Sequence, residues 1–70
     1  MYSFVKSLRN DGHTRRYSIE ATNNGWEVRE ERDSKVVRQT HYQDWHRVER
    51  ARSVFAFKFD TLRAQGWQEV

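Results

Sequence analysis

Residues 16–29 read RYSIEATNNGWEVR, and this stretch determines the expected fold of the chain. Apolar residues alternate with polar ones before and after its middle, so that Tyr17 and Ile19 face one way and Trp26 opens a second alternating run. A period of two residues is typical of strands with one buried and one exposed face. The Asn-Asn-Gly sequence at 23–25 favours a tight hairpin between the runs. The stretch predicts two paired antiparallel strands.

Similar pieces lie on both sides of this hairpin. Tyr2, Phe4 and Leu8 share a face of the preceding run, which ends at the turn sequence Asn10-Asp11-Gly12. Asp33-Ser34 is a weaker turn signal before a fourth extended piece. The phase of this last piece, residues 35–42, is ambiguous because Val36 and Val37 are adjacent. Turn signals between short alternating runs predict a four-stranded meander.

A helix is expected after the strands. Asp44 is a suitable N-cap, the periodic segment runs over about 45–65, and Gly66 can adopt the left-handed conformation that ends helices, with Trp67 folding back on the last turn. One apolar stripe contains Trp45, Val48, Ala51, Phe55, Phe59 and Leu62. The expected fold is α+β: a four-stranded antiparallel β-meander packed on one C-terminal amphipathic helix (ββββα), forming a single domain over residues 1–70.

Composition limits the class of protein. Ten large aromatic residues in 70 favour a folded chain, since disordered chains carry few. The chain has no cysteine, which excludes disulfides and thiolate metal sites. No apolar run is long enough to span a membrane and no leader pattern opens the chain. We therefore expect a cytoplasmic protein that does not contact membranes.

Catalytic and metal-binding patterns are missing from the sequence. His13, His41 and His46 are the only nitrogen ligand candidates, and their spacing matches no common metal motif. Ser18 and Ser53 have no evident catalytic partners, and no glycine-rich phosphate loop is present. We expect no enzymatic activity, no catalytic residue, no metal, no cofactor and no small-molecule substrate.

The net charge of +3 is confined to the second half of the chain, where residues 35–70 carry seven basic and four acidic side chains. Arginine accounts for ten of the thirteen basic residues, and its guanidinium group binds phosphate through two parallel hydrogen bonds. On the helix, the predicted phosphate contacts lie away from the apolar stripe. They are Arg47, Arg50 and Lys58. The alternative is an ordinary solvated face, balanced by Glu49 and Asp60.

The outer face of the sheet supplies further candidates for phosphate contacts. They are Arg16, Arg29 and Arg38. Tyr17 and Trp26 fall on the core side, and only Tyr42 is a candidate for the outer face. A surface that stacks bases needs exposed aromatics. Contacts to backbone phosphates are therefore expected rather than contacts to bases.

Val54, Phe57 and Ala64 are expected to face solvent on the back of the helix. Exposed apolar residues one turn apart form a small patch of the kind found at interfaces. The patch predicts a homodimer interface. Simple surface exposure and a docking site for another protein are the alternatives.

Four strands followed by a helix resemble the repeat unit of Pur-type single-stranded nucleic-acid binders, in which two units pack into one module. The chain also resembles WGR domains, although the Trp-Gly-Arg signature is missing. That likeness lies in Arg16-Tyr17, Gly25-Trp26-Glu27-Val28-Arg29, Phe55, Phe59 and Gly66-Trp67. Both resemblances imply binding of single-stranded DNA or RNA by a basic surface.

The expected function is therefore a small, non-enzymatic binding module that contacts nucleic acid through backbone phosphates as a homodimer. The alternative is a protein–protein interaction or regulatory module whose partner docks on the exposed helix face.

Overall fold

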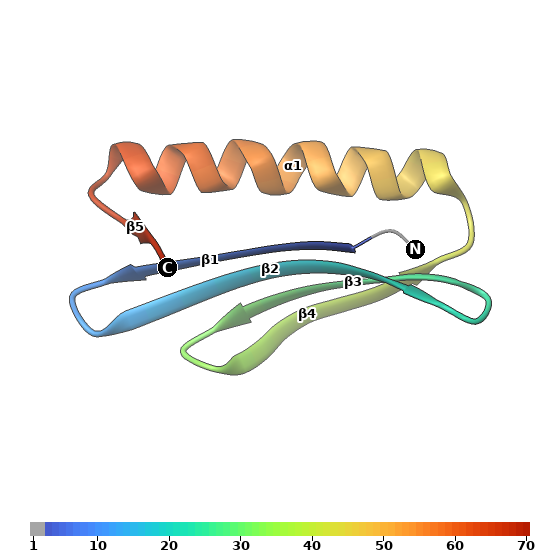
Figure 1. Cartoon of the computed structure of the whole chain (residues 1–70), viewed down its shortest axis with the longest axis horizontal. Coiled ribbons are helices and arrows are strands. Elements are labelled where there is room, and N and C mark those ends of the chain that lie inside the picture. The colour runs from blue at the N-terminus through green and yellow to red at the C-terminus, as the bar shows by residue number, and fades with distance from the viewer. Residues whose placement is uncertain (1–2) are drawn as a thin grey trace.

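The computed structural model describes residues 3–70. An antiparallel sheet of four main strands and a short fifth packs against one helix, which confirms the α+β class (Figure 1). Tyr2, expected on the apolar face of the first strand, lies outside the described residues. The elements are β1 (Ser3–Asn10), β2 (His13–Thr22), β3 (Gly25–Arg32), β4 (Lys35–Tyr42), α1 (Trp45–Ala64) and β5 (Gln68–Glu69).

The first four strands form the predicted meander, and the sheet order is β4-β3-β2-β1-β5. Two of the hairpins turn through residue pairs with positive φ. Asp11 and Gly12 adopt φ of 51° and 80°, and Asp33 and Ser34 adopt φ of 52° and 67°. Two consecutive left-handed residues match the right-handed twist of paired strands. The weak Asp33-Ser34 signal therefore marks a real turn that contains no glycine.

The alternation predicted for β2 and β3 is confirmed by the strand register, which places Ile19 opposite Val28 and Tyr17 opposite Glu30. These side chains belong to the inner face, which is the face covered by α1 (Figure 1). Tyr17 packs on the helix with its ring centroid 4.9 Å from that of Phe55. The buried core comprises Leu8, Tyr17, Ile19, Val28, Val48, Phe55, Phe59 and Leu62.

Both ends of α1 are capped as expected. The Asp44 side chain accepts a hydrogen bond of 2.9 Å from the backbone N–H of His46. At the other end, Gly66 has φ of 102°, and the N–H of Trp67 donates to the carbonyl of Leu62 at 3.0 Å. This bond returns the chain toward the sheet. Trp67 then packs against the core, and β5 pairs with β1.

Two features differ from the sequence prediction. The short strand β5 was not expected, since Gln68-Glu69 carries no alternating pattern. A register shift in the β3–β4 pair leaves Val37 without a partner, because Glu30 pairs with Arg38 while Glu31 pairs with Val36. Because of this bulge at Val37, the residues of β4 that follow it face the opposite side of the sheet from the one that uninterrupted alternation from the turn would give. Arg38 and Tyr42 consequently lie on the inner face, and their expected placement on the outer face is wrong.

One helix does not cover the whole inner face. Four strands at a spacing of about 4.8 Å are wider than a helix with side chains, which measures about 10 Å. The buried stripe of α1 packs on core residues of β1, β2 and β3, and Tyr42 of β4 packs against the same core. Around Arg38 and Thr40, the inner face of β4 borders an open depression. Within residues 3–70, no helix is long and apolar enough to cross a membrane.

Asp33 joins the β3–β4 turn to the start of β2. Its carboxylate accepts a bond of 3.0 Å from the Thr14 backbone N–H, and its own N–H donates to the Thr14 carbonyl at 2.9 Å. The His13 ring lies 3.2 Å from the same carboxylate. The Thr14 backbone bond, followed by the His13 bond, lowers the pKa of Asp33 from its ordinary value of 3.8.

A lowered folded-state pKa means that the Asp33 carboxylate stabilises the fold above pH 3.8, and that this contribution is lost as the pH falls through the lower folded value. We expect Asp33→Asn, which tolerates positive φ, to weaken the dependence of the urea midpoint on pH between about pH 5 and pH 2. Asp11→Asn, at the matching turn position of the β1–β2 hairpin, is the control. Equal pH dependence in the wild type and Asp33→Asn would contradict this role.

Candidate functional site

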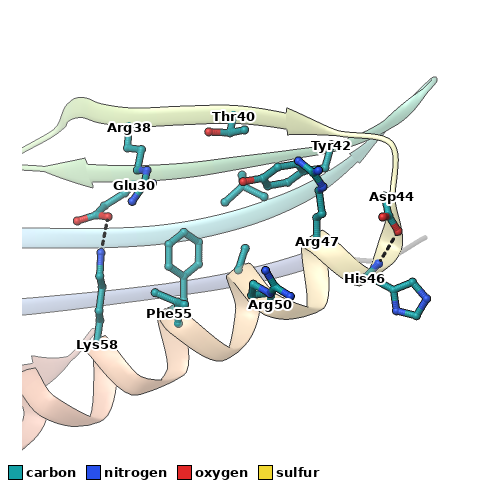
Figure 2. A pocket seen from close by; sticks show the side chains of 13 residues that line it. Glu30, Arg38, Thr40, Tyr42, Asp44, His46, Arg47, Arg50, Phe55 and Lys58 are labelled. Atoms are coloured by element: carbon teal, nitrogen blue, oxygen red, sulfur yellow. Dashed lines mark hydrogen bonds and ion pairs between the residues drawn. The ribbon is translucent and has the colours of Figure 1, made fainter.

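The open inner face of β4 and the adjacent flank of α1 form a groove of about 580 Å³. We call it the basic groove. Its principal lining residues are Arg38, Thr40 and Tyr42 from β4 and Arg47, Arg50 and Lys58 from α1. Figure 2 shows Arg38 extending from the strand into the space above the helix, while Lys58 rises from the helix to meet Glu30. Positive side chains from two elements therefore converge on one depression.

Three of the groove cations form no ion pair. Within residues 3–70, no carboxylate pairs with Arg38, Arg47 or Arg50. The groove lining holds four cations and two carboxylates, Asp44 and Glu30, so its positive charge exceeds its negative charge by two. The cations would repel one another in the absence of an anion, although water and salt screen part of the repulsion. The groove therefore favours a ligand with more than one negative charge.

Glu30 is the buried carboxylate of the groove, with only 4% of its surface exposed. Lys58 Nζ lies 3.2 Å from one of its oxygens, and Arg32 lies 3.7 Å from the other. A charge so poorly solvated must be paired to be tolerated. The pair fixes the Lys58 ammonium group against the sheet (Figure 2). The Lys58 ammonium group is therefore less available for a further contact than the three unpaired arginines.

The six predicted phosphate contacts divide into two groups. Arg38, Arg47, Arg50 and Lys58 line the basic groove, whereas Arg16 and Arg29 lie on the opposite face of the sheet. Arg29 is paired with Glu27, and Arg16 lies 3.9 Å from Glu31. The helix residues do not point straight away from the sheet as the helical pattern indicated. They lie on the flank of α1 that faces β4, where they line the basic groove.

The predicted interface residues are also separated by the structure. Val54 is 44% exposed and lines the basic groove. Phe57 is 72% exposed and is the most exposed large apolar side chain of the helix. Ala64 is exposed nearly two turns further on. Phe57 and Ala64 thus form a narrow outward ridge, with Phe57 also at the rim of a second depression, whereas Val54 belongs to the groove wall.

Several residues of the basic groove are not identifiable from the sequence pattern. Thr40, Tyr42 and Glu30 were not assigned to any site, and all three line the groove. The phase of β4 was the missing information, since one bulged residue moves an entire strand segment to the other face. For Glu30, the available signal was its place in the same alternating series as Trp26 and Val28, on the apolar face of β3.

The described residues contain no group of three or more His, Asp or Glu side chains placed to hold a metal ion. His13 lies in the Asp33 cluster, and His41 lies 3.2 Å from the Thr22 hydroxyl. His46 lines the end of the basic groove next to Asp44. The histidines are therefore dispersed over the fold.

No protein-family model matches the chain, and comparisons with curated proteins and with solved structures gave no match. The function proposed below therefore rests on the charges and the geometry of the basic groove.

The contribution of the Lys58–Glu30 ion pair to the free energy of unfolding can be tested by mutation. We expect Lys58→Met to lower the free energy of unfolding by about 1–2 kcal/mol, less than the 3–5 typical of fully buried pairs, because Lys58 is partly exposed and Arg32 remains. Glu30→Gln should relieve most of this loss when it is combined with Lys58→Met. Urea unfolding of the two single variants and the double variant measures the coupling. Additive effects of the two changes would show that the pair carries no interaction energy.

Proposed function

We propose that the protein is a non-enzymatic module that binds nucleic acid through backbone phosphates in the basic groove. The observation that carries this proposal is the convergence of Arg38, Arg47 and Arg50, none of which forms an ion pair with a carboxylate of residues 3–70. Guanidinium groups bind phosphate oxygens through paired hydrogen bonds, and such contacts supply most of the sequence-independent affinity. The chemistry of the groove therefore fits a polyanion with regularly spaced charges.

The dimensions of the groove favour a single strand as the ligand. A volume of about 580 Å³ is similar to that of a site for a small molecule, which is typically about 300–1,000 Å³. A duplex is far too wide to enter such a depression. Tyr42 is half-buried in the groove wall, so its ring offers a base only a limited surface for stacking. Base contacts are therefore secondary to phosphate contacts in this proposal.

Labelled oligonucleotides test the proposal by fluorescence anisotropy at low salt. If three arginines each neutralise one phosphate, log K should fall with log salt at a slope of about −2 to −3. Arg47→Gln/Arg50→Gln should weaken binding at least about ten-fold and flatten the slope by about 1.5.

Arg16→Gln/Arg29→Gln removes the same number of charges from the opposite face of the sheet and is the matched control. We expect it to change the affinity by less than about two-fold, apart from the long-range effect of net charge. Equal losses in the two double variants would show that the protein binds by net charge alone. A Kd weaker than about 100 μM for every oligonucleotide would reject nucleic-acid binding, since this is the weak end of non-specific affinity.

The second part of the proposal is that the protein forms a homodimer through the ridge of Phe57 and Ala64. Two basic grooves placed face to face would repel each other, so the outward ridge is the apolar helix surface left for self-association. The ridge is small compared with a stable interface, which buries about 800 Å² per partner. We therefore propose a dimer that dissociates on dilution.

Light scattering over a range of concentrations tests the dimer. The apparent mass should rise above the monomer value of 8.6 kDa as the concentration increases, and Phe57→Asp should return it to that value. Ala56→Asp introduces the same charge at an exposed position one residue away and should leave association unchanged. A constant mass of 8.6 kDa at every concentration would exclude the dimer.

The exposure of Phe57 also favours a second candidate function, a module that docks another protein on the same ridge. The two functions differ in the residues they need. Docking should be lost in Phe57→Asp and retained in Arg47→Gln/Arg50→Gln, whereas phosphate contacts should show the opposite pattern.

A further inference from the structure

A second depression lies beyond the Lys58–Glu30 pair, under the last turns of α1. It has a volume of about 270 Å³, and we call it the end cavity. The residues of the end cavity that matter here are Arg15, Tyr17, Glu30, Arg32, Lys58 and Gln65. None of the six predicted phosphate contacts except Lys58 belongs to it. The Lys58–Glu30 pair lines both depressions and therefore separates them.

Arg15 and Arg32 of the end cavity belong to a cross-strand row of like charges that continues to Lys35 beside the cavity. Arg15 on β2 lies directly opposite Arg32 on β3, and Arg32 lies directly opposite Lys35 on β4. Like charges in directly opposite positions destabilise a sheet. The repulsion among these three cations on neighbouring strands therefore destabilises the folded sheet. An anion bound beside them would reduce this repulsion.

The nearby carboxylates are already engaged. Glu30 pairs with Lys58 and Arg32, and Asp33 accepts hydrogen bonds from Thr14 and His13. In the lining of the end cavity, Arg15, Arg32 and Lys58 face Glu30 as the single carboxylate. The wall therefore carries an excess of about two positive charges at neutral pH.

Both arginines are held in place before any ligand arrives. The guanidinium group of Arg15 lies 5.1 Å from the centre of the Trp67 ring, and that of Arg32 is held by Glu30. Stacking and ion pairing restrict their side chains, so less conformational entropy is lost when they bind a ligand. The negative end of the helix dipole is nearby, but carbonyl groups of the last turn accept hydrogen bonds from Gln65, Gly66 and Trp67.

Tyr17 adds an independent observation. Its side chain is fully buried and lines the end cavity, and its hydroxyl group has no hydrogen-bond partner among residues 3–70. Buried hydroxyl groups without a partner are rare, and an acceptor supplied by a ligand would satisfy this one. The hydroxyl is covered from solvent, so an oxyanion contacts the arginines first and the hydroxyl only after the wall has adjusted.

We propose that the end cavity binds the dianionic phosphate group of a phosphate monoester or of free phosphate. Such a group carries about −1.5 to −2 charge at pH 7, which matches the positive excess of the wall. A carboxylate would neutralise only half of that excess. The Arg15 and Arg32 guanidinium groups bind the phosphate oxygens, and the remaining volume of the cavity accommodates the atoms to which the phosphate is attached.

Two sources could supply this phosphate group. One is a small phosphorylated molecule or inorganic phosphate, and the other is the terminal phosphate of a strand whose remaining phosphates occupy the basic groove. The site does not depend on the function proposed above, because neither Arg15 nor Arg32 lines the basic groove.

Titration of the full chain with inorganic phosphate at constant ionic strength, followed by ¹H–¹⁵N NMR, tests the site. We expect saturable shifts of the Arg15 and Arg32 side-chain Nε–H signals and of the Trp67 indole N–H. Arg15→Gln and Arg32→Gln should each weaken binding at least about ten-fold, as for a hydrogen bond between charged groups. Arg15→Lys keeps the charge without the paired hydrogen bonds, so it should weaken binding by about three- to five-fold.

The matched control is Arg16→Gln, which removes the neighbouring charge on the other face of the sheet. Circular dichroism establishes that each variant is folded, and Arg15→Lys remains informative if Arg32→Gln is not. Identical titration curves for the wild type and Arg15→Gln would overturn the proposal, as would equal weakening in Arg16→Gln.

Oligonucleotides with and without a 5′- or 3′-terminal phosphate distinguish the sources. If only the phosphorylated strands displace inorganic phosphate, the end cavity binds the terminal phosphate of a strand. If no strand displaces it, a small phosphate is the ligand, and failure of nucleic-acid binding leaves the site standing. Displacement of phosphate by phosphorylated and unphosphorylated strands alike would show that the cavity does not select a dianion, and would overturn the proposal.

Discussion

The mismatch in width between one helix and four strands is the constraint on which the rest of the structure depends. Because Phe55 and Phe59 pack over the middle of the sheet together with Val48 and Leu62, α1 leaves the inner face of β4 uncovered. An uncovered inner face must be lined by residues that tolerate water. Here it carries Arg38 and Thr40 in place of apolar side chains. The basic groove is thus a consequence of how the core is assembled.

Most of the fold could be predicted because its signals are local. The Asp11-Gly12 turn, the alternation in β2 and β3, the Asp44 cap and Gly66 each depend on residues close in sequence, and the structure confirms all of them. The Val37 bulge and β5 depend on pairing with distant segments. The adjacent valines Val36 and Val37 interrupt the period of two, but the pattern does not show which face the residues after them occupy. For this reason the face occupied by Arg38 and Tyr42 was assigned incorrectly.

The candidate site could be predicted only in part. Helical periodicity identified Arg47, Arg50 and Lys58 as one group, and the structure brings them together with Arg38. Helical periodicity does not show where a helix lies on a sheet. It therefore could not show that the groove excludes Arg16 and Arg29, which lie on the outer face of the sheet. It also could not show that Glu30 neutralises Lys58, because these residues are far apart in sequence and meet only in the folded chain.

The sequential order of the strands has a consequence for biosynthesis. Each hairpin closes through neighbouring residues, and hairpins form within about 1–10 μs. The helix that covers Leu8, Tyr17 and Ile19 follows all four strands in the chain, and a ribosome adds about 5–20 residues per second. A nascent meander therefore keeps its apolar face uncovered for seconds before α1 emerges. During that interval its uncovered apolar face favours aggregation with other unfinished chains.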